Sequence, residues 1–350
     1  MQIISLERAL ELGFDTVHVF QFAGFGDAVQ FGVVAREKVS QTGAPLLMAT
    51  KPKNYDMLRG IDDGLPAEIF ILDGYYSQIV NKKNIRRLGK MGLHVNYFCQ
   101  SGRHIIAYEI AAGMGMTGTV DLTPYLHIDK KLDDFGRLVD GPQIAIMAGG
   151  HPYKSIPNHV LQEIIDHFKH KYNFVQIGLA DDPLLSGVID MRGKLSFFQQ
   201  VPALLRASDL FIGNEGGLMH MAAAVRTRAV IGDALYGVLT ADVAHIHVSP
   251  KKRKPFKCKF PGDMETIQAE DFFEPIEQQM KLALSGAPVP RNIVSIDGVP
   301  AHRRRIRRDS LIVNLIDLAW RSVNGLLRGR GLPHDRFEQL KYKLRYGIPL

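Results

Sequence analysis

The sequence predicts an α/β protein whose parallel sheets are covered by helices on both faces. Short apolar runs alternate with helical patterns along the whole chain, and strands that are buried on both faces produce such runs. The 350 residues are enough for two domains of ordinary size, each with its own core. A glycine-containing turn follows one apolar run in each half, which is where such sheets bind their ligands.

In the first half, a short helix over 6–12 precedes a strand that ends at Phe22. The remaining elements expected there are a helix over 28–40, strands over 45–49, 69–72 and 94–98, and a helix over 104–113. A polar stretch rich in proline and glycine, 121–141, is typical of a connection between domains. We therefore expect a first domain over 1–142.

The second half opens on an apolar run, 143–150, that ends in glycines. The elements expected after it are a helix over 158–170, a strand over 174–178, a helix over 195–207, a strand over 210–212 and a small-residue helix. These elements predict a second domain over 143–285, followed by a tail over 286–350.

The turn after the strand Leu210–Ile212 is the most informative segment. It contains Glu215, Gly216 and Gly217 and leads directly into a helix. Such a turn brings backbone N–H groups and the positive end of a helix dipole to one point, and the two glycines have no Cβ to keep phosphates away. An ordinary strand-to-helix connection also favours glycine, so this segment alone leaves both interpretations open.

A second turn follows the strand that begins at Val17. Its sequence is Phe22-Ala23-Gly24-Phe25-Gly26-Asp27, and a helix is expected from Ala28. A lone Gly-x-Gly is weak evidence for a ligand site, and Asp27 is also placed to cap the helix that follows.

Taken together, the two turns resemble glycosyltransferase family 9, the heptosyltransferases of lipopolysaccharide assembly. In that family an Asp-Ser/Thr-Gly-x-x-His-Leu-Ala-Ala turn holds the sugar nucleotide, and a Gly-x-Gly-Asp turn lies on the acceptor side. The resemblance covers about residues 16–285 and is dense over 143–232. It implies a GT-B-like fold: two Rossmann-like domains with parallel sheets facing a central cleft, here with a basic helical tail at the C-terminus.

The resemblance also implies roles for individual residues. Asp27 matches the proposed general base, with Gly24 and Gly26 on the acceptor side. The donor phosphates are expected at Lys154, Gly216, Gly217, Leu218 and His220, and the rest of the donor at Asn214, Glu215, Gly178 and Leu179. Lys154 keeps a second interpretation as a surface lysine, and His220 as a packing residue. His104 lies in a stretch that resembles the family's His-Arg-x-x-x-Tyr segment, and it is either a substrate contact or a residue that packs its helix.

The implied reaction is sugar transfer with inversion, from a nucleotide-diphosphate sugar to a glycan or glycolipid. No metal held by an Asp-x-Asp pair and no separate cofactor is expected, and the resemblance favours an ADP-sugar as co-substrate. Two features depart from the family: Glu215-Gly216 replaces the aspartate and hydroxyl residue, and no Thr-Pro follows Asp27. These departures leave open a catalytically silent relative that binds a glycan or nucleotide. An oxidoreductase is disfavoured because 24–29 lacks Gly-x-Gly-x-x-Gly.

The positive charge of the chain is concentrated near its C-terminus. The whole chain has a net charge of +7, and 291–350 alone holds 13 Lys and Arg against 5 Asp and Glu. Five arginines over 303–308 precede a pattern with one broad apolar face, which is typical of a helix on an anionic membrane surface or of one that packs across both domains. The run 251–259 holds six cations and is either a solvated loop or a contact with an anionic acceptor or bilayer. No recognised nucleic-acid motif occurs.

The expected location is the cytoplasm. The first residues carry acid and base where a signal peptide would be apolar, and no apolar stretch is long enough to span a membrane. Cys99 and Cys258 lack metal-ligand spacing, which agrees with a reducing compartment. The basic tail adds a peripheral position on the inner face of the membrane as an open interpretation.

Overall fold

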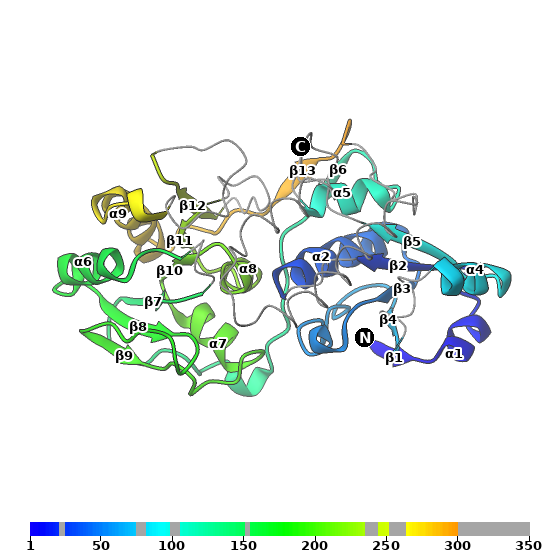
Figure 1. The fold of residues 1–350 in the computed structure, drawn as a ribbon, viewed down its shortest axis with the longest axis horizontal. Coiled ribbons are helices and arrows are strands. Elements are labelled where there is room, and N and C mark those ends of the chain that lie inside the picture. The colour runs from blue at the N-terminus through cyan, green and yellow to red at the C-terminus, as the bar shows by residue number, and fades with distance from the viewer. Residues whose placement is uncertain are drawn as a thin grey trace, which may run out of the picture.

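The computed structural model describes residues 1–20, 25–74, 82–98, 106–150, 155–234, 244–251 and 264–299. Two α/β halves lie side by side along the long axis of the molecule, each built on its own parallel sheet (Figure 1). The predicted α/β fold class with parallel sheets is therefore confirmed.

The sheet of the first half has five parallel strands in the order β1-β4-β3-β2-β5. The strands are β1 (Gln2–Ile4), β2 (Thr16–Phe20), β3 (Leu46–Ala49), β4 (Ile69–Leu72) and β5 (His94–Phe98). The helices are α1 (Leu6–Glu11), α2 (Phe25–Thr42), α4 (Lys82–Lys90) and α5 (Ile106–Gly113), with a 3-10 turn at Pro52–Asn54. One face of the sheet packs against α2 and α5, and the other packs against residues of α1 and α4. Both faces are covered, as a parallel sheet requires.

The sheet of the second half has six parallel strands in the order β12-β11-β10-β7-β8-β9. The strands are β7 (Gln143–Met147), β8 (Asn173–Ile177), β9 (Val188–Asp190), β10 (Leu210–Asn214), β11 (Ala229–Gly232) and β12 (His245–Val248). The helices are α6 (Asn158–Phe168), α7 (Gln200–Ala207), α8 (Gly217–Ala224) and α9 (Glu270–Leu284), with a 3-10 turn at Met264–Thr266. Helices α6 and α9 cover one face of the sheet, and α7 and α8 cover the other. The core beneath α7 and α8 also takes in Ala28 and Val29 of α2, so this core joins the two halves.

The chain crosses between the halves twice. The first crossing contains a 3-10 turn at Lys130–Leu132, and the second returns after α9. Strand β13 (Ile293–Ser295) then pairs antiparallel with β6 (Thr119–Asp121), and Ile296 is 2% exposed in the core of the first half. Arg228 donates to the carbonyls of Ala287 and Pro288, both at 3.0 Å, and so anchors the second crossing.

Several element boundaries differ from the prediction. Helix α2 begins at Phe25, so Gly26 and Asp27 lie in its first turn instead of preceding it. Helix α7 begins at Gln200 instead of Leu195, because residues 196–199 form a turn that is closed by hydrogen bonds between the backbone and side chains of Ser196 and Gln200. The opening of the expected tail, 286–299, contains β13. Some predicted features lie outside the described residues: Gly24, Cys99, His104, Lys154, residues 252–259 of the basic run with Cys258, and the tail from 300 onward.

Candidate active site

The predicted phosphate-binding turn forms where β10 passes into α8. Gly216 occupies the N-cap position of α8 and, as a glycine, has no side chain to cap the helix. Gly217 and Leu218 are the first residues of the helix. A Cβ at Gly216 would meet no atom within 4 Å, so this side of the turn is open. The first N–H groups of a helix have no partners within it, which is why such a terminus binds anions. Leu218 is 7% exposed and its side chain belongs to the core. Leu218 can therefore contribute only its backbone N–H to anion binding.

Asn214 ties this turn to the loop that follows β7. Its Oδ1 accepts from the N–H of Ile156 at 2.6 Å, and its Nδ2 donates to the carbonyl of Gly149 at 2.7 Å. The side chain is 4% exposed and both of its polar atoms are used. Asn214 therefore positions the two ends of the loop that carries Lys154. The backbone N–H of Glu215 donates to Gly232 at 3.1 Å and joins the turn to β11.

Gly178 and Leu179 follow β8 at the same carboxyl edge of the sheet. The Asp182 carboxylate lies between Gly149 and Gly178, where a Cβ would come within 2.3 Å and 2.4 Å of its oxygens. Asp182 also accepts from the N–H of Leu179 at 2.7 Å, and the side chain of Leu179 is 66% exposed. The loops after β7, β8 and β10 thus form one connected edge, as ligand sites of α/β sheets do.

Arg192 connects the end of β9 to the loop after β8. Its guanidinium donates to the Asp190 carboxylate at 2.8 Å and also to the carbonyl of Asp182. The hydrogen bonds from the side chain and backbone of Arg192 to the Asp190 carboxylate favour its ionised form and lower the pKa of Asp190 to about 2. The segment 190–194 therefore supports the loop that holds Leu179.

In the first half, α2 begins directly opposite α8. Asp27 is its third residue and is half-buried. Gly26 lies against the ring of His220, and Gln30 Nε2 lies 3.2 Å from His220 Nδ1. A Cβ at Gly217 would stand 3.6 Å from that of Phe25. The two glycine turns, far apart in sequence, thus meet between the halves, where α2 and α8 lie side by side (Figure 1).

An aromatic cluster extends this meeting point. The ring of Phe25 lies 5.0 Å from that of Phe197 and 5.4 Å from that of Phe198, centroid to centroid, and Lys53 Nζ stands 5.1 Å from the Phe25 ring. These contacts again join the first half to the second.

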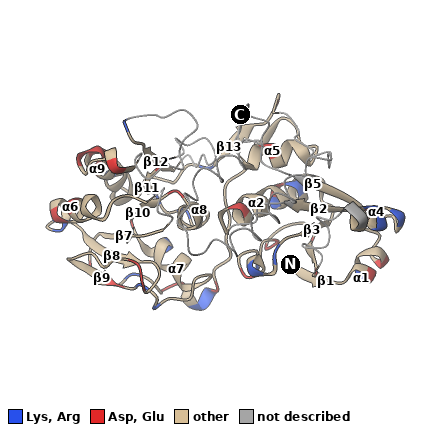
Figure 2. Cartoon of the chain, viewed as in Figure 1, with Lys and Arg blue, Asp and Glu red and all other residues tan. Residues whose placement is uncertain are grey.

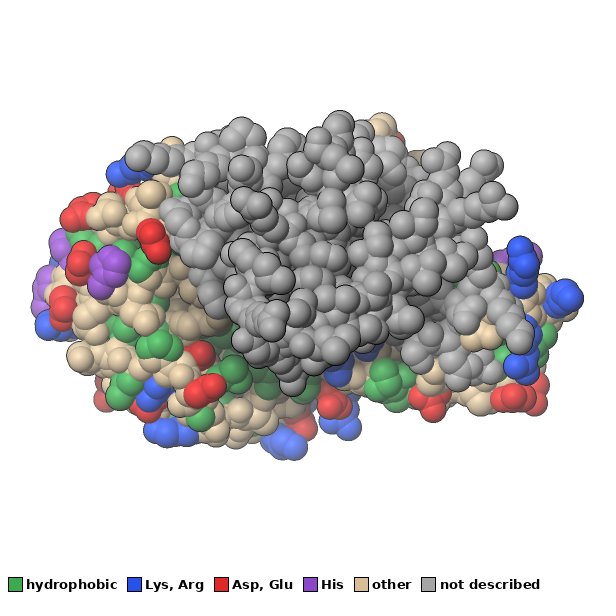
Figure 3. Space-filling view, viewed as in Figure 1, with side chains coloured by type: hydrophobic (Ala, Val, Ile, Leu, Met, Phe, Trp, Pro, Cys, Tyr) green, Lys and Arg blue, Asp and Glu red, His purple; other side chains and the backbone are tan. Residues whose placement is uncertain are grey.

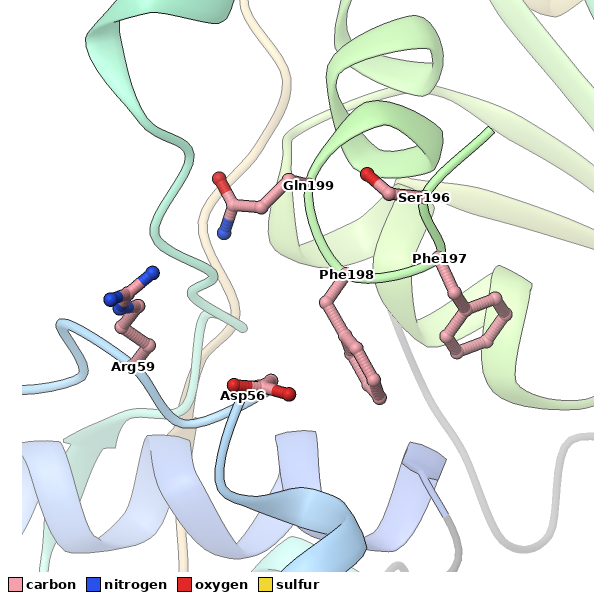
Figure 4. Close-up of a pocket in the computed structure, with 6 residues that line it drawn as sticks. All are labelled: Asp56, Arg59, Ser196, Phe197, Phe198 and Gln199. Atoms are coloured by element: carbon pink, nitrogen blue, oxygen red, sulfur yellow. The ribbon is translucent and has the colours of Figure 1, made fainter. Parts of the chain in front are cut away.

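A pocket of about 170 Å³ opens beside the cluster, between the halves (Figure 4). Asp56 and Arg59 line it from the first half, and the turn 196–199 lines it from the second. The Gln199 amide extends to the side of the pocket on which Arg59 lies. Another pocket, of about 290 Å³, lies beside Gly149 and the start of α6.

Basic side chains gather at the far end of the first half. Five of the nine residues of α4 are Lys or Arg, and Arg86, Arg87 and Lys90 are exposed (Figures 2 and 3). Among the described residues, no group of three or more His, Cys, Asp or Glu side chains is arranged to hold a metal ion. No helix in the described part of the chain is both long and apolar enough to span a membrane.

The comparisons with known proteins agree with this geometry. The sequence model of "Glycosyltransferase family 9 (heptosyltransferase)" matches residues 183–249, which contain the β10–α8 turn. No curated protein matches the chain in sequence.

Solved structures of the same fold cover most of the chain. A family 9 glycosyltransferase of Veillonella parvula matches with a TM-score of 0.57 and 12% identity, over 76% of this chain and 97% of that one. ADP-heptose lipopolysaccharide heptosyltransferase II of Escherichia coli matches with a TM-score of 0.57 and 14% identity, over 76% and 98%. The heptosyltransferase TibC of enterotoxigenic E. coli, in complex with ADP-D-β-D-heptose, matches with a TM-score of 0.57 and 14% identity, over 76% of each chain.

The comparisons define the class of fold: the chain has the α/β fold of the glycosyltransferase structures it matches, with one parallel sheet in each half. Within that class, its resemblance is to glycosyltransferase family 9, as the two turns predict.

Three features of the site escaped the sequence analysis. The positions of Phe25 and Gln30 against α8 depend on how the halves meet, which no local pattern reveals. The hydrogen bonds of Asn214 to the loop after β7 are equally non-local. The basic helix α4 did have a signal, the run Lys-Lys-Asn-Ile-Arg-Arg-Leu-Gly-Lys.

Proposed function

We propose that this chain is an inverting, metal-independent glycosyltransferase that transfers heptose or a related sugar from an ADP-sugar to a hydroxyl of a glycan or glycolipid. The observation that carries the proposal is the meeting of the two turns, which brings the first turn of α2, with Asp27, against the first turn of α8. The ADP-D-β-D-heptose bound to TibC supports the choice of donor.

The chemistry assigns a role to each side of this meeting point. Asp27 takes the proton of the acceptor hydroxyl as its oxygen attacks the anomeric carbon from the face opposite the diphosphate. The bond from that carbon to the diphosphate oxygen breaks, and ADP leaves with the electron pair. The N–H groups at the start of α8, together with Lys154, stabilise the growing negative charge.

The substitution Asp27→Asn tests the role of the base. It should lower the turnover of ADP-heptose by ~10²–10⁴, because the amide cannot accept the proton, while ADP affinity stays nearly unchanged. Release of ADP measures turnover, and calorimetry measures affinity. Asp15→Asn is the matched control, since Asp15 is exposed and precedes β2 at the opposite end of that strand. Full activity of Asp27→Asn would contradict the assignment, and a loss on addition of EDTA would contradict metal independence.

A catalytically silent relative is the second candidate. It is favoured by Glu215-Gly216 in the donor turn and by the position of Phe25, which covers part of the start of α8. Thermal shifts with ADP-, GDP-, UDP- and CMP-sugars separate the candidates, because a ligand of the folded state raises Tm. Binding of ADP-heptose without release of ADP, with or without an acceptor glycan, would favour the silent relative.

We also propose that the protein works in the cytoplasm at the inner face of an anionic membrane, where a glycolipid acceptor would lie. The exposed cations of α4 and the arginines over 303–308 support this, since each cation near such a surface contributes roughly 1 kcal/mol. Binding to anionic liposomes at low salt tests the proposed membrane location, and a protein that does not bind such liposomes would contradict it.

A further inference from the structure

His220 and Gln30 form a buried contact between the two halves. His220 is the fourth residue of α8, Gln30 is the sixth of α2, and Nδ1 and Nε2 lie 3.2 Å apart. The residues are 6% and 8% exposed. A buried hydrogen bond of this kind is costly to break on one side only, because the remaining group loses its partner.

Gly26 makes room for this contact. A Cβ there would lie 2.2 Å from His220 Cδ2 and 2.7 Å from Nε2, which no real side chain could occupy. The backbone of Gly26 is not among the positive-φ positions, so the conformation itself does not call for glycine. The imidazole ring is therefore what requires a glycine at position 26.

A hydrogen bond across this contact assigns the roles. The Gln30 amide nitrogen can only donate, so Nδ1 must accept, and this requires the neutral imidazole that carries its proton on Nε2. Nδ1 is thereby committed to the first half of the molecule.

We infer that His220 is a positioning residue that fixes α2, and with it Asp27, against the donor turn. Asp27 adjoins Gly26 and lies three residues before Gln30, so it shares the face of α2 that meets α8. A displacement of about 1 Å at a reacting group can lower turnover by ~10². This inference rests on the proposed function for its catalytic consequence, and the contact itself can be tested without it.

The first test separates positioning from phosphate binding. His220→Phe should lower the turnover of ADP-heptose by ~10–10² while the affinity for ADP changes less than about threefold. His220→Asn should recover most of the turnover, since an Asn oxygen can replace Nδ1 as acceptor for Gln30. A large loss of ADP affinity in both variants, with no recovery by asparagine, would make His220 a phosphate ligand and overturn the inference.

The second test asks whether the two side chains act as one unit. Gln30→Leu should reproduce the loss of His220→Phe, and the double variant should be no worse than either single variant. Losses that multiply in the double variant would show independent roles and contradict the inference.

The third test needs no substrate. Gly26→Ala should lower Tm because its methyl group would displace the His220 ring, and adding His220→Ala should restore Tm because the ring is gone. Gly89→Ala in α4 is the matched control, since a Cβ there meets no atom within 4 Å. An unchanged Tm in Gly26→Ala would overturn the contact. If the chain released no ADP from any donor, the proposed function would fail while this test still judged the contact.

Discussion

Gly216 departs from the family pattern, and the structure leaves room for a side chain there. Its backbone is extended, with φ 160° and ψ −163°, and a Cβ would meet no atom within 4 Å. Gly216→Ser should raise the stability by a few tenths of a kcal/mol, because serine caps helices slightly better than glycine. It should also strengthen ADP binding about two- to tenfold through one added hydrogen bond. Thermal unfolding and calorimetry check both expectations.

Gly136→Ser is the contrasting variant for that experiment. Gly136 has φ +106°, and a Cβ would lie 2.5 Å from the Leu204 Cα, so serine there should cost about 1–3 kcal/mol. A lower Tm in Gly216→Ser as well would show that position 216 is closed to side chains and would contradict the prediction.

At the scale of the elements, Asn214 links the end of β10 to the loop after β7. Asn214→Ala should destabilise the protein by about 1–3 kcal/mol, since it leaves the buried N–H of Ile156 without its partner. ADP affinity should fall as well, because the loop that carries Lys154 loses its anchor. Asn173→Ala is the control at the opposite edge of the sheet, where the side chain is exposed and donates to Pro142 at 3.3 Å. Equal stability of the two variants would contradict the role given to Asn214.

Local patterns were enough to predict most elements. The turn after β10 and the helix after it appear where glycine and small residues follow an apolar run, and β3, β4, β5 and β8 fall within two residues of their expected bounds. Strand β1 was missed because three residues are too short for a recognisable pattern. Helix α4 was missed because six of its nine residues are Lys, Arg or Asn, and within 84–90 only Leu88 is buried.

The contacts within the site could not be predicted in the same way. The sequence placed Gly26 on the acceptor side and left His220 between phosphate binding and packing. The structure brings these two residues into contact across 194 positions of sequence, because the helices that carry them pack together where the two halves meet. The predicted roles of Asp27 and of the donor residues remain predictions.

At the scale of the whole molecule, the segment after α9 belongs to the core of the first half. A chain that ends at residue 290 should be less stable than one that ends at 299, since it also removes the partner of β6 and the buried Ile296. A buried isoleucine side chain alone accounts for about 2–5 kcal/mol. Urea unfolding compares the two chains with the full-length protein.

The same pair of truncations tests the proposed membrane role of the tail. The chain that ends at 299 should bind anionic liposomes more weakly than the full-length protein, because it lacks the five arginines over 303–308. Unchanged liposome binding would assign adhesion to the cations of α4 instead. Equal stability of the chains ending at 290 and 299 would contradict the role given to β13.

The return of the chain to its first half restricts how this enzyme can be recombined with others. A hybrid that takes its donor specificity from another glycosyltransferase would exchange the second half. The order of the chain suggests that replacing every residue from 143 onward would achieve this exchange. Such a hybrid would pair a foreign β13 with this chain's β6 and set a foreign residue against Asp121, which Arg291 contacts here. The exchange should therefore stop near residue 285 and keep 286–299 from the parent of the first half. A hybrid designed in this way treats the second half as an insertion within the chain of the first half, with residues of the first half on both sides of it.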